Sequence, residues 1–188
     1  MRMLETKRLL LKPVEESDLL ELLELQWDKD LMHYMNFKPL SFENQKEWLK
    51  SLGKTNLTFS IFLKEEFNTI LIGLATLNQI DHIHQRASWG LKLKTNIQSK
   101  GLGFESSLIL LNFAFSNLNL QKIHGDIIFE NFANRRMCEK IGVREEGILI
   151  NHIYQNGKFR NLVLVGILKE EFYTKNLEKL KNLELIND

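Results

Sequence analysis

A glycine-containing loop, Gln98-Ser99-Lys100-Gly101-Leu102-Gly103-Phe104-Glu105, carries the clearest chemical signal in the sequence. It follows an extended segment and leads into an apolar stretch that is typical of a helix. Backbone N–H groups at a helix N-terminus are unpaired, and the helix dipole favours negative charge there. Gly101 and Gly103 leave the backbone bare, so a phosphate can approach it closely. The loop therefore predicts an anion site, although two glycines in a loop are not specific by themselves.

A second segment with residues suited to ligand binding lies one predicted strand later. It reads Asn131-Phe132-Ala133-Asn134-Arg135-Arg136-Met137-Cys138-Glu139-Lys140-Ile141-Gly142-Val143. It is typical of a short basic helix that ends at Gly142. Cys138 is the only cysteine of the chain. A lone cysteine excludes an internal disulfide and a cysteine-based zinc cage, and we expect no metal.

The composition is that of an ordinary globular protein, with 188 residues, 44% of them hydrophobic and 26% charged. This length fits one domain, residues 1–188, with a core of its own. The net charge of +1 argues against a broad nucleic-acid footprint. We find neither a signal-peptide pattern nor an apolar run of about 20 residues, and therefore expect a cytoplasmic protein without membrane contact.

The hydrophobic periodicity predicts seven strands and five helices. The predicted strands cover residues 6–13, 57–63, 69–77, 87–95, 122–130, 147–154 and 159–168. The predicted helices cover residues 17–27, 41–52, 104–117, 132–141 and 169–185, of which the last forms a C-terminal extension over 170–188. Asn156-Gly157 is a strong hairpin signal between the last two strands. We predict an α/β (α+β) domain with a mixed, mostly antiparallel sheet and helices on both faces.

These segments, in this order, resemble the GNAT superfamily of N-acetyltransferases. The likeness is greatest to the branch that includes ribosomal-protein N-terminal acetyltransferases, and it covers about residues 3–172. Four parts carry it: Glu5 to Leu11, the opening strand; Gly90 to Leu93 with Gln98 to Glu105, the coenzyme A loop; Asn131 to Val143, the second signature; and Glu146-Gly147 with Asn156-Gly157, the last two strands.

The resemblance implies acetyl-CoA as co-substrate, with its pyrophosphate at Gln98, Ser99, Lys100, Gly101, Leu102, Gly103 and Phe104. In the family the strand before this loop diverges from its neighbour. Backbone groups near Leu91 and Leu93 would then pair with the pantetheine arm and polarise the thioester carbonyl.

The same resemblance gives the second signature a part in binding the coenzyme. Asn131 would hydrogen-bond the pantetheine arm. Asn134 stands where the family usually has serine and is expected to cap the following helix. Cations around the two signatures are expected to meet the phosphates: Lys92, Lys94, Lys100, Arg135, Arg136 and Lys140.

Acetyl transfer to an amine needs a neutral amine, a polarised carbonyl and a proton for the thiolate that leaves. Cys138 stands where many family members have a tyrosine that protonates the sulfur, but it could equally pack as a small buried hydrophobe. Asp126, Glu130 and His124 share one face of the predicted strand 122–130 and are the candidate bases. Ser88 occupies a position where this branch often has glutamate, and a water chain could replace a dedicated base.

The acceptor is the open part of the prediction. By resemblance, His33, Tyr34 and Tyr154 would line its pocket. We favour a protein N-terminus, with an amino-sugar nucleotide or a polyamine as alternatives. Ser88 also motivates a further alternative, a coenzyme A-binding domain without activity. The apolar C-terminal helix and an exposed sheet edge are compatible with a homodimer.

Overall fold

The described part of the chain forms one eight-stranded sheet, in the order β1-β2-β3-β4-β5-β6-β8-β7. The computed structural model describes residues 4–34, 40–53, 55–97 and 100–186. Neighbouring strands are antiparallel except for β5 and β6, which are parallel. The strands are β1 (Leu4–Glu5), β2 (Leu9–Pro13), β3 (Leu57–Lys64), β4 (Thr69–Asp81), β5 (Arg86–Leu93), β6 (Lys122–Ile128), β7 (Arg144–Gln155) and β8 (Lys158–Leu168).

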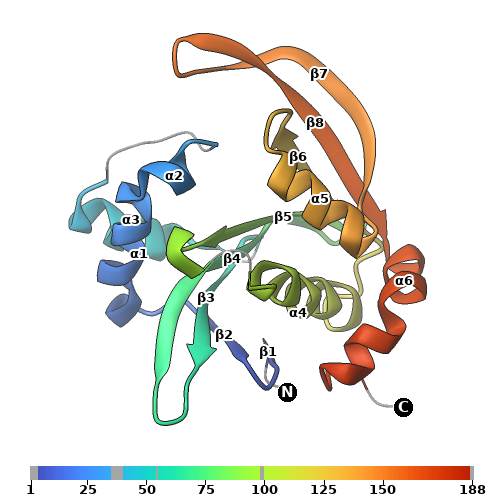
Figure 1. The fold of residues 1–188 in the computed structure, drawn as a ribbon, viewed down its shortest axis with the longest axis horizontal. Coiled ribbons are helices and arrows are strands. Elements are labelled where there is room, and N and C mark those ends of the chain that lie inside the picture. The colour runs from blue at the N-terminus through green and yellow to red at the C-terminus, as the bar shows by residue number, and fades with distance from the viewer. Residues whose placement is uncertain (1–3, 35–39, 54, 98–99, 187–188) are drawn as a thin grey trace.

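Helices cover both faces of this sheet, as predicted (Figure 1). On one side α1 (Leu19–Trp27), α2 (Lys29–Met32) and α3 (Phe42–Ser51) enclose a small apolar cluster that contains Leu22, Leu25 and Leu71. On the other side the main core holds residues of α4 (Leu102–Ser116), α5 (Phe132–Ile141) and α6 (Lys169–Asn182). The rings of Phe115 in α4 and Phe172 in α6 lie 5.2 Å apart, so the C-terminal helix packs into this core.

The sheet has one strand more than the seven predicted, because β1 precedes the expected strand 6–13, of which residues 9–13 form β2. The hydroxyl of Thr6 accepts a hydrogen bond from the backbone N–H of Leu9 at 3.0 Å. The Thr6 N–H in turn donates to the Leu9 carbonyl at 2.9 Å. These bonds close a turn that folds β1 back onto β2. A side chain that competes for backbone partners in this way is not visible in a hydrophobic pattern.

The hairpin predicted at Asn156-Gly157 is present and joins β7 to β8. Both residues have positive φ, +52° and +80°, which is the type I′ geometry that suits two twisted strands. The two strands form a long arm that arches past α5 (Figure 1). The rings of Tyr154 and Phe159 stack edge to face at its outer end, 5.2 Å apart.

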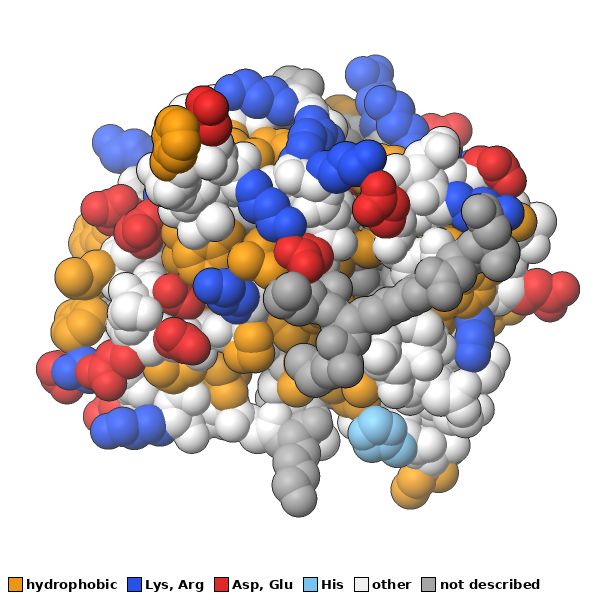
Figure 2. Space-filling view, turned by 90° about the horizontal axis from the view of Figure 1, so that it is seen from below, with side chains coloured by type: hydrophobic (Ala, Val, Ile, Leu, Met, Phe, Trp, Pro, Cys, Tyr) orange, Lys and Arg blue, Asp and Glu red, His pale blue; other side chains and the backbone are white. Residues whose placement is uncertain are grey.

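The surface carries charges of both signs. Figure 2 shows basic and acidic side chains interspersed on one face, with apolar side chains between them. In the part of the chain that the structure describes, no helix is both long and apolar enough to cross a membrane.

A buried carboxylate fixes α4 to the first turn of the chain. The Glu105 side chain is only 4% exposed. It accepts the Thr6 hydroxyl at 2.5 Å and the Arg8 Nε at 2.8 Å, and a second guanidinium nitrogen of Arg8 also reaches it. Arg8 also donates to the carbonyl of Lys100 at 3.3 Å. Arg8 therefore bonds to residues before and within the first turn of α4, Lys100 and Glu105.

We expect Glu105→Ala to lower the free energy of unfolding by roughly 2–3 kcal/mol, because it leaves two donors without their charged acceptor. Urea unfolding at pH 7 measures this. Lys7→Ala is the control, since its pair with Glu184 at 3.0 Å is largely exposed and should contribute little. Equal stability of the Glu105 variant and the wild type would contradict the assignment.

Candidate functional site

The parallel strands β5 and β6 separate after three residue pairs. Their register joins Arg86, Ala87 and Ser88 to Lys122, Ile123 and His124. Beyond this point β5 stays paired with β4 as far as Leu93, and β6 stays paired with β8 as far as Ile128. The facing edges of residues 89–93 and 125–128 thus have no ladder between them. This is the divergence that the resemblance implied, and it leaves backbone groups available to a ligand.

The N-terminus of α4 follows the open end of β5. Gly101 has φ +76° and precedes the first helical residue, a conformation that residues with a side chain rarely adopt. The N–H of Glu105 bonds to the Gly101 carbonyl at 3.1 Å. The N–H groups of the three residues before it have no acceptor in the same helix. Gln98 and Ser99 of the predicted loop lie outside the described residues.

The absence of a side chain at Gly103 allows close packing of α4 on the sheet, rather than close approach of a phosphate to the backbone. A Cβ on Gly103 would lie 3.3 Å from a Leu93 methyl carbon, 3.4 Å from the Met137 sulfur and 3.6 Å from a Leu91 methyl carbon. The missing side chain therefore lets α4 pack closely on β5 and α5. The expectation that Gly103 leaves space for a phosphate is therefore corrected. Its backbone N–H is still one of the three in the first turn of α4 that have no acceptor within the helix.

Two observations fit a pantetheine arm in the opening between β5 and β6, beside α4. The Ser106 hydroxyl, one turn after Gly103 on the same helix, is buried and has no hydrogen-bond partner in the described structure. Leu91 and Leu93 both turn their side chains towards Gly103, so their backbone edge is the part that faces the gap to β6. An orphan hydroxyl and the edge of Leu91, which has no ladder to β6, suit the amides of such an arm.

The second signature forms α5, and Asn131 rather than Asn134 caps it. The Asn131 side chain accepts the backbone N–H of Asn134 at 3.1 Å. The side-chain oxygen of Asn134 instead accepts the Cys138 thiol at 3.7 Å. The cap falls on Asn131 because the helix begins at Phe132, three residues earlier than a cap at Asn134 needs.

Cys138 lies in the main core and is 3% exposed. Burial raises the pKa of its thiol to about 12. An ordinary thiol, such as that of the coenzyme, has a pKa of about 8.5. Proton transfer from the Cys138 thiol to the departing thiolate would therefore be unfavourable in free energy. The acid role of Cys138 stays a prediction, and its surroundings favour packing.

The cations expected at the phosphates divide into two groups. Lys100, Arg136 and Lys140 are exposed around the start of α4 and along α5, and they form no ion pair with a described residue. Lys94 instead pairs with Glu21 at 3.2 Å, and Arg135 pairs with Glu145 at 2.7 Å.

Lys92, the sixth of these cations, is not at the phosphate end. Side chains alternate along a strand, so Lys92 points to the sheet face opposite Leu91 and Leu93, towards α1 and α3.

The three candidate bases have different surroundings. His124 stands opposite Ser88 in the last pair before β5 and β6 diverge. Burial lowers the pKa of its imidazole, with smaller contributions from Arg86 and Lys122, so it is neutral near pH 7. Asp126 is exposed. The Glu130 carboxylate lies 3.7 Å from the Arg160 guanidinium.

The three aromatic residues predicted for the acceptor pocket are all exposed. His33 and Tyr34 follow α2, are exposed, and have ring centres 4.7 Å apart. Tyr154 is 64% exposed on the β7–β8 arm. None of the three lines either of the two hollows found beside α1.

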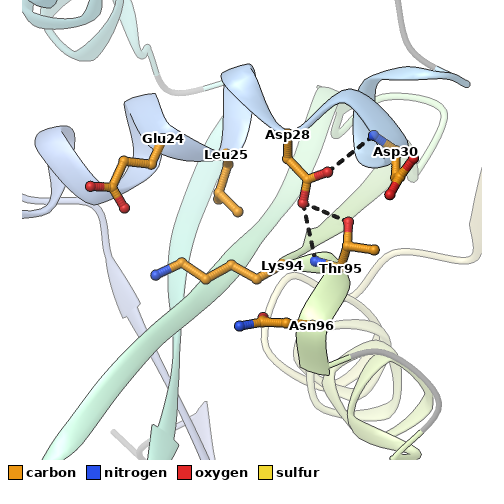
Figure 3. A pocket seen from close by; sticks show the side chains of 7 residues that line it. All are labelled: Glu24, Leu25, Asp28, Asp30, Lys94, Thr95 and Asn96. Carbon is orange, nitrogen blue, oxygen red and sulfur yellow. Dashed lines mark hydrogen bonds between the residues drawn. The ribbon is translucent and has the colours of Figure 1, made fainter.

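The first hollow lies between α1, α2 and the segment after β5 (Figure 3). It is lined by Glu24, Leu25, Asp28, Asp30, Lys94, Thr95 and Asn96. The Asp28 carboxylate caps α2 and also accepts the Thr95 hydroxyl at 2.5 Å, the bond that does most to lower its pKa. Asp28 thus ties the helices to the strand end and is already engaged within the protein.

The second hollow is a cavity of about 280 Å³ between α1, α3 and the sheet. Its lining residues are Leu22, Leu25, Gln26, Leu40, Gln45, Trp48, Leu74, Thr76, Asn78 and Lys92. Lys92 and Gln45 are site residues that we did not predict in this role. The alternation of side chains along β5 could have predicted that Lys92 faces away from Leu91 and Leu93. No pattern in the sequence predicts that Gln45 lies in the same cavity.

Within the described residues, no group of three or more His, Cys, Asp or Glu side chains is placed to hold a metal ion.

Comparison with known proteins identifies the family. Residues 8–144 match the model of the Acetyltransferase (GNAT) domain. An uncharacterized N-acetyltransferase, p20, of Bacillus licheniformis is 28% identical over 92% of this chain and 99% of that protein. The spermidine N(1)-acetyltransferase of Vibrio cholerae is 28% identical over 90% of this chain and 98% of that protein.

Solved structures share the fold. The crystal structure of the Vibrio cholerae spermidine N-acetyltransferase in complex with CoA and spermine gives a TM-score of 0.81 at 26% identity, covering 87% of this chain and 97% of that one. These relatives do not single out the ribosomal-protein branch that the sequence favoured. With its open β5–β6 pair and free helix N-terminus, the chain belongs to the GNAT acetyltransferases and is an acyltransferase that takes acetyl-CoA as co-substrate.

Proposed function

We propose that this chain transfers the acetyl group of acetyl-CoA directly to the primary amine of a small molecule. The observation that carries the proposal is the divergence of β5 and β6 beside the free N-terminus of α4. A thioester inserted there would meet unpaired peptide groups, and its phosphates would meet a helix dipole. Lys100 and Arg136 are available to the same phosphates.

The chemistry needs little from side chains. The amine nitrogen attacks the carbonyl carbon, backbone N–H groups of β5 stabilise the oxyanion, and the carbon–sulfur bond breaks as the thiolate leaves. One proton must leave the amine and one must reach the thiolate. His124 is our candidate for accepting the first, because it is neutral and stands where the strands part.

The named relatives favour a small amine as the acceptor. A named relative that matches nearly the whole chain is a spermidine N(1)-acetyltransferase, which supports a small amine over the protein N-terminus that we favoured from sequence. A polyamine, our earlier alternative, is therefore the reference acceptor. An amino-sugar acceptor stays a prediction that no comparison tests.

The direct test is release of free thiol from acetyl-CoA in the presence of an amine panel: spermidine, glucosamine, glucosamine 6-phosphate, an alanine-initiated peptide, L-alanine and L-alaninamide. We expect amine-dependent release, with an acetylated product of the expected mass. Tight binding of coenzyme A without turnover of any amine would overturn the enzyme proposal and support a binding domain.

We expect Gly101→Val to raise the Kd for coenzyme A by about tenfold or more, measured by calorimetry. A β-branched side chain at φ +76° costs on the order of 1–3 kcal/mol and displaces the start of α4. Gly53→Val is the matched control, because a Cβ there meets nothing within 4 Å. Unchanged affinity in a folded Gly101 variant would remove the loop from the coenzyme site.

We expect His124→Gln to lower kcat by about 100-fold with little change in KM, as loss of a general base does. Asp126→Asn, two residues along the same strand but exposed, is the control and should retain kcat within about twofold. The reverse pattern would transfer the role to Asp126, and full activity of both variants would point to a water chain.

A further inference from the structure

The cavity between α1, α3 and the sheet lies on the side from which an acceptor can reach the gap between β5 and β6. Lys92 in its wall stands between Leu91 and Leu93, whose backbone edge faces that gap. The cavity therefore adjoins the place where the thioester carbonyl would be held. A volume of about 280 Å³ suits a molecule of amino acid or amino-sugar size.

Lys92 is an unusual group to find in such a wall. Its ammonium forms no hydrogen bond or ion pair with a described residue, whereas its neighbour Lys94 pairs with Glu21. Burial lowers the pKa of the Lys92 side chain, and no carboxylate offsets this. A partly buried ammonium without an ion pair to a described residue is costly, so a group of opposite charge that enters the cavity is favoured.

Gln45 is a second polar group in the same wall. It is 2% exposed, lines the same cavity, and its side-chain amide bonds to no described residue. Buried amides are normally hydrogen-bonded, and this one offers both donors and an acceptor. The rest of the wall is apolar or neutral, and among the residues that the structure describes it contains no Asp or Glu.

We propose that the acceptor carries an anionic group, a phosphate or a carboxylate, close to the amine that is acetylated, and that Lys92 with Gln45 binds this group. The proposal rests on the acetyl transfer proposed above and names its substrate class. Lys92 fixes the acceptor by charge, Gln45 by hydrogen bonds, and the leucine and Trp48 side chains enclose the carbon skeleton.

This charge distribution separates the chain from a polyamine enzyme. Spermidine carries further ammonium groups, and one of them would meet Lys92 with no carboxylate in the described wall to compensate. The neighbouring hollow does contain carboxylates. They are Glu24, Asp28 and Asp30; Asp28 is engaged by Thr95, and Lys94 lines the same hollow, so the spermidine arm of the test below decides between the two hollows.

Matched acceptors test the proposal: glucosamine 6-phosphate against glucosamine for phosphate, L-alanine against L-alaninamide for carboxylate, and spermidine as polycation. We expect one anionic member to exceed its neutral partner in kcat/KM by about tenfold or more. Lys92→Met should remove this preference through KM, with the Kd for coenzyme A unchanged. Lys94→Met, the adjacent paired lysine, should keep the preference.

A binding measurement separates this inference from the function it rests on. Calorimetry follows glucosamine 6-phosphate and L-alanine binding to wild type and Lys92→Met, each saturated with coenzyme A. Lys92-dependent binding without turnover would retain the anion site and reject the transferase proposal.

Other outcomes overturn the inference directly. Turnover that favours spermidine, and that Lys92→Met leaves unchanged, would keep the enzyme and reject the anionic acceptor. Absence of binding by both anionic probes would reject it as well. Gln45→Leu, which keeps the volume but removes the amide, should weaken binding of the preferred anionic probe by about three- to tenfold.

Discussion

The short parallel pairing of β5 with β6 is the constraint on which the rest of the site depends. The sheet is otherwise antiparallel, and each of these strands keeps its other neighbour along its whole length. Because β4 holds one edge and β8 the other, the two strands separate without loss of the sheet. Peptide groups are strong hydrogen-bonding groups, and in the proposed complex the coenzyme pairs with those of the edge that has no ladder to β6.

The start of α4 has to stay next to this opening, and a buried carboxylate does that. The Glu105 carboxylate accepts hydrogen bonds from Thr6 and Arg8, which lie in the turn between β1 and β2. Arg8 also donates to the Lys100 carbonyl. Thr6 also closes the turn that folds β1 back onto β2, through its bonds with Leu9. The position of the α4 N-terminus and the turn between β1 and β2 therefore depend on one network.

The two faces of β5 have separate tasks. Leu91 and Leu93 face Gly103 of α4, on the side proposed for the coenzyme, while Lys92 lines the cavity beneath α1 and α3. The donor side is built from backbone and small residues, which many sequences can provide. The proposed acceptor side is built from individual side chains, and the Lys92 ammonium forms no ion pair with a described residue.

The sequence by itself determined the order of the main elements, the helices on both faces and the Asn156-Gly157 hairpin, because these follow from local periodicity and turn chemistry. It did not determine the cap of α5, the burial of Cys138 or the neighbours of Lys92. Asn131 and Asn134 are equally good caps by type, and only the exact start of the helix chooses between them. Lys92 and Gln45 lie 47 positions apart in the chain. Only the packing of α3 over β4 and β5 brings them into one cavity, since contacts between distant segments depend on how whole elements stack and leave no periodic trace in either segment.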